Sequence, residues 1–229
     1  MEFERSSFLA TVRLGSLTSQ TDVVMTLIVL ILVAYALGSL PCGLWLVRAQ
    51  GIDLRTIGSG NVGATNVWRA SGRSIALLVL VLDAGKGAVA VLLARVVIDE
   101  PYALAACAVV VVAGHVWPVW AGFRGGKGVA TVAGAFALIE PMAVVWCVMA
   151  FGCFVAMTRY VSVGSLAAAI VLPMATLLAG GGWSETLSAC LTTALVLWRH
   201  RANIARLRRG TEPRVGARNI DRRRTPFVV

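Results

Sequence analysis

Charged residues are scarce in this sequence of 229 amino acids: they make up 14% of the chain, and only 11 of them are acidic. Soluble domains typically carry about 25% charged and about 45–50% apolar residues, whereas 58% of this chain is hydrophobic. The composition excludes an ordinary soluble domain, and the abundance of apolar residues excludes an intrinsically disordered chain. Because apolar runs extend along most of the sequence, we interpret it as one polytopic membrane domain.

Histidine and cysteine, which proteins use for metal binding and covalent catalysis, are also rare. The chain has two histidines, and its five cysteines are scattered through apolar stretches without a C-x-x-C pair. We interpret the cysteines as small, reduced core residues. No cluster suits a metal ion, and no Ser–His–Asp arrangement is legible. We therefore expect an enzyme without cofactor or metal, which would act by binding and positioning anions rather than through a covalent nucleophile.

Long apolar runs predict the membrane spans. A bilayer core of about 30 Å requires about 20 helical residues, and residues 24–47 satisfy this requirement for a first span. Further apolar runs follow at residues 74–98, 102–121, 128–157, 161–179 and 186–198. Glu140-Pro141 interrupts the longest run. Because proline lacks the backbone donor of a helix interior, we divide 128–157 into two short spans or half-helices.

The distribution of charge predicts the topology. Basic residues gather in four places: residues 48–73, Arg124 with Lys127, Arg159, and the tail from Arg199. The connections between them are acidic: Asp99-Glu100, Glu140 and Glu185. Because basic residues mark cytoplasmic loops, an even number of spans separates the basic clusters. We predict an all-α polytopic protein of about seven transmembrane helices, short or broken ones included, with the N-terminus outside and the C-terminus cytoplasmic. Five spans remain an alternative if 128–157 re-enters without crossing.

The ends of the chain differ in composition from its middle. Residues 1–22 form a polar leader, 23–212 the membrane domain, and 213–229 a basic C-terminal extension. Residues 199–229 hold ten arginines against two carboxylates. In a membrane protein, such a basic segment indicates a cytoplasmic location, anionic lipid or a phosphorylated substrate.

A glycine-rich loop at residues 58–66 is the first candidate site. Its glycines match the dinucleotide fingerprint, but that motif needs a surrounding βαβ unit, and this loop lies between two membrane spans. Glycines still allow backbone N–H groups to approach an oxyanion. The loop adds neutral donors and nearby charges: Ser59, Asn61, Thr65, Asn66, Arg55 and Arg69. We interpret the loop as a phosphate cradle, with an ordinary solvated turn as the alternative.

Two further motifs lie on the predicted basic side. Residues 122–128 resemble a Walker loop but fail its spacing, so a nucleotide hydrolase is not expected; Lys127 remains a suitable point charge for phosphate. His200 and Asn203 are three residues apart and share a helix face. The alternative for both motifs is a basic anchor at the lipid headgroups. Ser162 is placed as a helix cap, which can also hold an anion.

Polar residues also occur at membrane depth. Asp83 and Lys86 are three residues apart within one apolar run and can pair. Intramembrane charge suggests function by default, although a purely structural pair is an equal alternative. His115 lies near the end of its span, where we expect a hydrogen bond to a loop rather than a direct chemical role.

Read in order, these motifs resemble the bacterial acyl-phosphate:glycerol-3-phosphate acyltransferase family. The matching segments are residues 38–41, 53–69, 83–87, 114–118, 123–131, 159–162 and 199–212. The resemblance covers about residues 30–212, and the order and spacing of the motifs are highly specific. It implies a seven-span bacterial inner-membrane enzyme whose active site faces the cytoplasm.

The resemblance also implies the reaction and its participants. A fatty acyl group would pass from acyl phosphate to the 1-hydroxyl of sn-glycerol 3-phosphate, giving lysophosphatidic acid and phosphate in the first acylation step of phospholipid synthesis. The expected partners are these substrates, the lipid bilayer and, as candidates, the enzymes that make acyl phosphate and add the second chain; no nucleic acid is expected. An organic-phosphate transporter is the alternative, because buried charge and broken helices occur there too.

The family motifs assign a role to each candidate residue. The acyl-phosphate head is matched to Ser59, Gly60, Asn61 and Thr65. Glycerol 3-phosphate is matched to Arg69, Lys127, Ser162, His200 and Asn203. Lys127, His200 and Asn203 are the predicted catalytic residues. The proton acceptor for the attacking hydroxyl stays open between His200 and a phosphate oxygen of the substrate.

Overall fold

The computed structural model describes residues 20–216, and within that range every regular element is a helix. The elements are α2 (Gln20–Gly38), α3 (Cys42–Arg48), α4 (Ala64–Ser71), α5 (Arg73–Val97), α6 (Pro101–Val116), the 3-10 helix η1 (Val119–Ala121), α7 (Val129–Ile139), α8 (Pro141–Thr158), α9 (Val161–Leu178), α10 (Trp183–Arg199) and α11 (Arg201–Arg208). Helices are the expected result, because a backbone in lipid must satisfy its hydrogen bonds within one segment. The predicted all-α fold is confirmed.

Among residues 20–216, five segments are long and apolar enough to cross a membrane: Gln20–Arg48, Arg73–Val97, Pro101–Ala121, Pro141–Thr158 and Val161–Leu178. The 17 residues of α10 come close to that length. The run 128–157 breaks at Glu140, as predicted, but its two parts are unequal. With 11 residues, α7 extends only about 16 Å, whereas α8 has 18 residues. The run is therefore one half-length helix followed by one of full length, not two short spans.

The first apolar run is also interrupted. Residues 24–47 fall within one candidate span, Gln20–Arg48, as expected, but this span is not one continuous helix: α2 ends at Gly38 and α3 begins at Cys42. Pro41 precedes α3, and it has no N–H with which to continue the hydrogen-bond pattern of α2. The Lys86 ammonium of α5 donates to the Leu40 carbonyl at 3.0 Å, which compensates for the break.

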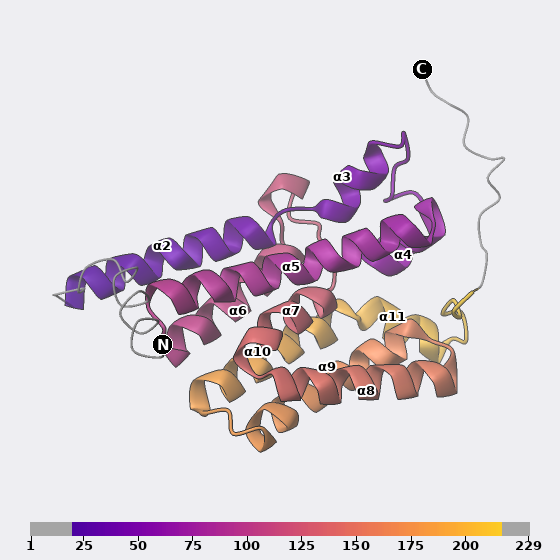
Figure 1. Cartoon of the computed structure of the whole chain (residues 1–229). Coiled ribbons are helices and arrows are strands. Elements are labelled where there is room, and N and C mark those ends of the chain that lie inside the picture. The colour runs from indigo at the N-terminus through magenta and orange to yellow at the C-terminus, as the bar shows by residue number, and fades with distance from the viewer. Residues whose placement is uncertain (1–19, 217–229) are drawn as a thin grey trace, which may run out of the picture.

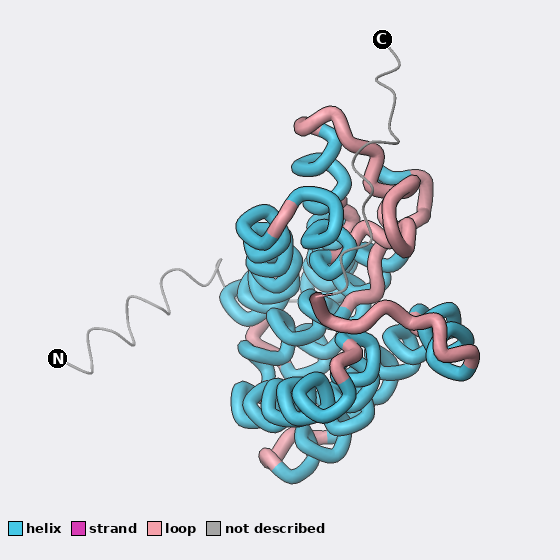
Figure 2. The backbone as a smooth tube through the Cα atoms, turned by 90° about the vertical axis from the view of Figure 1, so that its right-hand side faces the viewer, coloured by secondary structure: helices cyan, strands magenta, loops and turns pink. Residues whose placement is uncertain are grey.

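Basic and acidic connections lie at opposite ends of the bundle. In Figure 1, α3, α4 and α11 lie at the end opposite the start of α2, and Figure 2 views the molecule from that end. At the other end, Arg95 of α5 donates to the Leu138 carbonyl of α7. Burial and the neighbouring Glu185 raise the pKa of Glu140 there. The acidic connections thus cluster as the charge pattern predicts.

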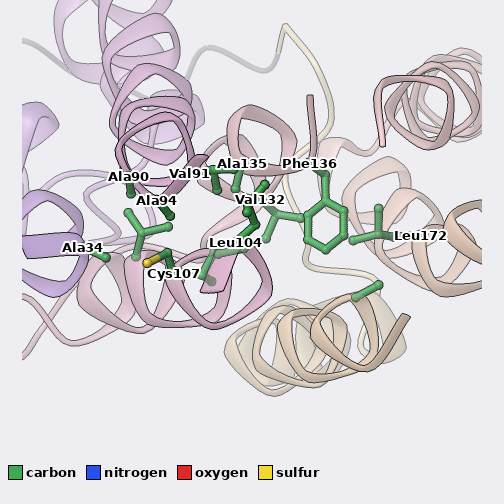
Figure 3. Packing of buried hydrophobic residues seen from close by; sticks show 14 of the residues in the cluster. Ala34, Ala90, Val91, Ala94, Leu104, Cys107, Val132, Ala135, Phe136 and Leu172 are labelled. Atoms are coloured by element: carbon green, nitrogen blue, oxygen red, sulfur yellow. The ribbon is translucent and has the colours of Figure 1, made fainter. Parts of the chain in front are cut away.

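The apolar core joins helices that are far apart in the sequence. Buried side chains extend from Ala34 of α2 and Val91 of α5 through Cys107 of α6 to Phe136 of α7 and Leu172 of α9. Figure 3 shows the Phe136 ring between α7 and the Leu172 side chain. Phe136 is fully buried, so it fixes the position of the short helix α7 against its neighbours.

The close contact between α5 and α7 depends on glycine. A methyl group added at Gly134 would lie 1.9 Å from the Ala84 carbonyl oxygen, a backbone atom that cannot rotate away. We therefore expect Gly134→Ala to separate the helices and lower stability by about 1–3 kcal/mol. Thermal unfolding in detergent measures this loss. Gly85→Ala is the control on α5, because a methyl group there meets nothing within 4 Å; equal melting temperatures for the two variants would contradict the prediction.

The predicted boundaries at both ends of the membrane domain stay predictions. Most of the leader 1–22 and of the extension 213–229 lies outside the described residues. The first residues of the extension do contact the domain, since the Val215 N–H donates to the Arg159 carbonyl at 2.7 Å.

Candidate active site

One cavity of about 160 Å³ opens at the end of the bundle that carries the basic loops. Eight of the nine predicted site residues line it: Ser59, Asn61, Thr65, Arg69, Lys127, Ser162, His200 and Asn203. They come from four separate parts of the chain: the glycine loop with α4, the loop before α7, the start of α9, and the α10–α11 junction. The ninth, Gly60, is not in the cavity wall, and its N–H donates to the Ile57 carbonyl at 3.0 Å.

The glycine loop is held together by Asn66, which we had expected to contact an anion. The Asn66 amide donates to the carbonyls of Leu54 and Ile57, at 3.2 and 2.9 Å, and its oxygen accepts the Ser59 N–H at 3.1 Å. Asn66 is only 2% exposed, so it shapes the loop instead of supplying a free donor. Gly58, with a φ of +58°, permits this turn.

Two arginines also have partners that differ from the sequence interpretation. Arg55 does not line the cavity, because its guanidinium donates to the Ala121 carbonyl at 2.7 Å. Arg199 is not a lipid anchor: its guanidinium donates to the carbonyls of Gly126 and Gly125, at 3.0 and 2.8 Å. Arg199 therefore clamps the loop that carries Lys127.

The Lys127 loop is fixed from the other side by α6. The Gly126 N–H donates to the His115 carbonyl at 3.0 Å, and the Gly125 N–H donates to the Val116 carbonyl at 3.1 Å. Burial, together with the nearby arginines, lowers the pKa of Lys127 to about 8. The ammonium thus remains mostly protonated at neutral pH, and an anion in the cavity would stabilise its charge further.

His200 is held in one tautomer. Its Nδ1 lies 2.7 Å from the Val196 carbonyl. Since a carbonyl oxygen only accepts, Nδ1 carries the proton and Nε2 presents a lone pair. Burial and the neighbouring Lys127 lower the pKa of His200 to about 4, so the imidazole is neutral at physiological pH. His200 can therefore accept a hydrogen bond from a hydroxyl group, but it does not contribute positive charge.

Glu212 is a residue to which the sequence analysis gave no role. Its two carboxylate oxygens accept from Asn203 Nδ2 at 2.6 Å and from Arg206 Nε at 2.7 Å. Although burial opposes ionisation, these bonds and the nearby Ser162 hydroxyl hold the pKa of Glu212 below its usual range. Glu212 therefore orients Asn203 and Arg206 at the cavity wall. The nine-residue separation from Asn203 gave no signal for this contact.

Asp83 and His115 also line the cavity; the sequence analysis left Asp83 open between a functional role and a structural pair with Lys86, and expected a loop contact for His115. The wall thus combines three cations, Arg69, Lys127 and Arg206, with two carboxylates and neutral donors. Ser162 adds a buried hydroxyl that forms no hydrogen bond of good geometry within residues 20–216. Within the same range, no group of three or more His, Cys, Asp or Glu residues could hold a metal ion. This arrangement suits phosphorylated ligands.

Comparisons with known proteins agree with this chemistry. The family model described as glycerol-3-phosphate acyltransferase matches residues 28–210. The glycerol-3-phosphate acyltransferase of Rubrobacter xylanophilus is 43% identical over 197 residues, which are 84% of this chain and 96% of that protein. The corresponding protein of Geotalea daltonii is 45% identical over 186 residues, covering 81% and 95% of the two chains.

Two crystal structures of PlsY, an integral membrane glycerol 3-phosphate acyltransferase, share the fold. Its glycerol 3-phosphate form has a TM-score of 0.80 and 38% identity, and the alignment covers 83% of this chain and 96% of that chain. Its lysophosphatidic acid form has a TM-score of 0.78 and 37% identity, with the same coverage. With the family model, the relatives and the solved structures in agreement, this chain belongs to the glycerol-3-phosphate acyltransferase family.

Proposed function

We propose that this membrane enzyme transfers a fatty acyl group from acyl phosphate to the 1-hydroxyl of sn-glycerol 3-phosphate, releasing lysophosphatidic acid and inorganic phosphate. The observation that carries the proposal is the convergence of Arg69, Lys127, His200 and Asn203 in one cavity beside the glycine loop. The names of the relatives and the two ligand forms of PlsY support the acceptor and the product. The reaction opens phospholipid synthesis, so the enzymes before and after it are candidate partners.

The reaction needs two phosphate pockets close together. The glycine loop and the N-terminus of α4, which both reach the cavity, suit the acyl-phosphate head through Ser59, Asn61 and Thr65. Gly60, whose N–H is bonded to the Ile57 carbonyl, would serve by shaping the loop. The other candidates in the lining suit glycerol 3-phosphate: Arg69, one turn after Thr65 on α4, with Lys127, Ser162, His200 and Asn203. Holding two reactants in place can lower a barrier by roughly 7–11 kcal/mol. Lys127 reaches into the shared space and would contact both phosphates.

The chemistry requires no acyl-enzyme intermediate. Acyl phosphate is a mixed anhydride with a good leaving group. The acceptor hydroxyl oxygen attacks the carbonyl carbon, the bond from that carbon to the phosphate oxygen breaks, and inorganic phosphate leaves. Fixed donors at the developing oxyanion are each worth about 2.7–4 kcal/mol. The cations and amides of the cavity supply such donors.

The acyl chain would enter from the lipid. The cavity has an apolar side that includes Leu80 of α5, Ala130 of α7 and Phe151 of α8. Leu80 is 46% exposed on the surface of a membrane helix, so a chain attached to the phosphate head can extend from this side into the bilayer. The product could leave by the same route without crossing the polar part of the cavity.

The proton of the attacking hydroxyl goes to a phosphate oxygen of the substrate. His200 is a weak base, since its pKa is lowered to about 4, whereas the second pKa of a phosphate monoester is about 6. His200 has no carboxylate partner on Nδ1, which is bonded to the Val196 carbonyl. Its Nε2 is therefore assigned to orient the hydroxyl.

We expect His200→Ala to weaken the use of glycerol 3-phosphate while leaving acyl-phosphate binding nearly unchanged. If His200 only orients the acceptor, KM rises and saturating glycerol 3-phosphate recovers much of kcat. Steady-state kinetics with each substrate varied in turn measures this split. A loss of kcat that saturation does not relieve would make His200 the general base, and wild-type kinetics would remove it from the site.

The proposed activity is tested with purified protein in detergent. Release of phosphate from acyl phosphate only when glycerol 3-phosphate is present, with stoichiometric lysophosphatidic acid, is the expected result. Phosphate release that is independent of glycerol 3-phosphate would overturn the proposal. Reconstituted vesicles serve as the second assay, because uptake of glycerol 3-phosphate without turnover would identify a transporter.

We further propose the bacterial inner membrane as the location, with the cavity facing the cytoplasm and the N-terminus outside. The support is the separation of basic and acidic connections between the two ends of the bundle. In a variant without native cysteines, an impermeant thiol reagent applied outside should label cysteines at positions 99 and 185. Cysteines at 124 and 211 should react only after permeabilisation. External labelling at 124 or 211 would reverse the orientation.

A further inference from the structure

A buried ion pair inside the bundle has no role in the reaction described so far. Asp83 Oδ1 and Lys86 Nζ of α5 are 2.9 Å apart, and the two side chains are only 6% and 4% exposed, respectively. Charge at membrane depth is costly and commonly functional. The pairing explains how each charge tolerates its surroundings, but it does not explain why α5 carries either of them.

A third side chain links this pair to the cavity. His115 Nδ1 of α6 lies 3.5 Å from the same Asp83 oxygen, and both Asp83 and His115 line the cavity. On the far side, Lys86 donates to the Leu40 carbonyl at the α2–α3 break. Lys86, itself bonded to the Leu40 carbonyl, thus fixes the Asp83 carboxylate, and this carboxylate restrains the His115 imidazole.

The His115 ring in turn supports the loop that carries Lys127. A methyl group added at Gly126 would lie 2.1 Å from His115 Nε2, so the ring edge is packed against the backbone of Gly126. The His115 carbonyl also accepts the Gly126 N–H at 3.0 Å. Because Lys127 is the next residue, the position of the His115 ring determines how far its ammonium extends into the cavity.

We propose that Asp83 and His115 are positioning residues for the acyl transfer: together they hold the Lys127 loop at the depth at which its ammonium meets the phosphate groups of the substrates. His115 Nε2 faces Gly126, so the imidazole acts on the loop and not on the reacting atoms. The proposal rests on the proposed function for its activity assay, but not for its binding assay.

A double-mutant cycle tests whether Asp83 acts through Lys127. Asp83→Asn keeps the shape of the side chain and weakens the hold on His115; we expect kcat/KM to fall about 5- to 20-fold, as for other coupled neighbours. In a Lys127→Ala background, the same substitution should change kcat/KM by less than about 2-fold, because the residue that it positions is already gone. Equal losses in the two backgrounds would overturn the proposal.

Two controls separate positioning from stability. Thr193→Val removes a buried hydrogen bond between α10 and α9, from Thr193 Oγ1 to the Ala169 carbonyl at 2.7 Å, away from the cavity wall. Its effect on kcat/KM should be the same with and without Lys127.

If Asp83→Asn fails to fold because Lys86 is left unpaired, the charge-neutral double variant Asp83→Asn/Lys86→Gln replaces it. Within the cycle, His115→Asn, which retains a donor near Asp83, should preserve more activity than His115→Ala.

Binding of inorganic phosphate provides a readout that does not depend on turnover. We expect phosphate to raise the melting temperature of the wild type, and this shift to shrink in both Lys127→Ala and Asp83→Asn. A full phosphate shift in Asp83→Asn, beside a reduced one in Lys127→Ala, would overturn the positioning role. Failure of acyl transfer in the wild type, with the phosphate shifts as expected, would overturn only the proposed function.

Discussion

Replacing Lys127 with alanine is expected to lower kcat/KM about 10- to 150-fold. Hydrogen bonds to charged groups contribute about 1.5–3 kcal/mol, and each 1.36 kcal/mol is a tenfold change in rate. Arg199 and Arg206 cannot replace Lys127, because Arg199 is bonded to the carbonyls of Gly125 and Gly126 and Arg206 to Glu212. The loss would exceed this range if Lys127 contacts both phosphates.

The pH dependence of kcat/KM tests whether the charge of the Lys127 ammonium accounts for this loss. Because its pKa is lowered to about 8, kcat/KM of the wild type should fall as pH rises through about 8. Lys127→Ala should lack this limb, and Lys127→Arg should retain its charge at alkaline pH. Folding stability changes with pH in the opposite sense. Because the pKa of Lys127 is lower in the folded protein, burying its ammonium reduces the free energy of unfolding below about pH 8. This reduction declines as pH rises from there toward the pKa of lysine in the unfolded chain. Lys127→Ala should therefore melt no lower than the wild type at pH 7.

Gly126→Ala is expected to reduce kcat/KM on the order of 100-fold, the size of effect that a misplacement of about 1 Å produces in a catalytic group. The added methyl group would meet the buried His115 ring at 2.1 Å. The loop cannot shift outward without losing the bonds from Arg199 to the carbonyls of Gly125 and Gly126. The Lys127 ammonium must then leave its position.

The matched control for this substitution is Gly152→Ala on α8, where an added methyl group meets nothing within 4 Å. Its kcat/KM should equal that of the wild type, and its melting temperature should change little. Melting curves of both variants show whether Gly126→Ala remains folded. A folded Gly126→Ala enzyme with more than half of the wild-type kcat/KM would contradict the proposed contact between His115 and the loop.

Much of the architecture could be predicted from local sequence signals. Apolar runs located the helices, and Glu140-Pro141 marked the boundary between α7 and α8. These signals are local, because helix formation in lipid depends on the hydrophobicity and backbone donors of one segment. The length of a helix within an apolar run depends less on local sequence. The helix α7 ends after 11 residues, and the packing of Phe136 in the core, not hydropathy alone, stabilises so short a helix.

The candidate site was predictable as a set of residue types but not as a set of contacts. Lys127, Ser162, His200 and Asn203 do line one cavity, and the ordered motifs were enough to select them. The sequence did not distinguish them from Asn66, Arg55 and Arg199, which have the same donor groups but bond to backbone carbonyls. A donor is available to a ligand only when no protein acceptor is nearer, and the nearest acceptor often belongs to another helix.

The sequence by itself determined that this protein is a helical membrane protein of the acyltransferase type, with a phosphate-binding end marked by glycine and basic residues. Only the tertiary structure decided that Asp83 faces His115 and that Glu212 holds Asn203. Those partners lie on different helices or loops, and their meeting depends on how closely the helices pack. Glycines such as Gly126 and Gly134 permit that approach, since a side chain at either position would meet the neighbouring segment.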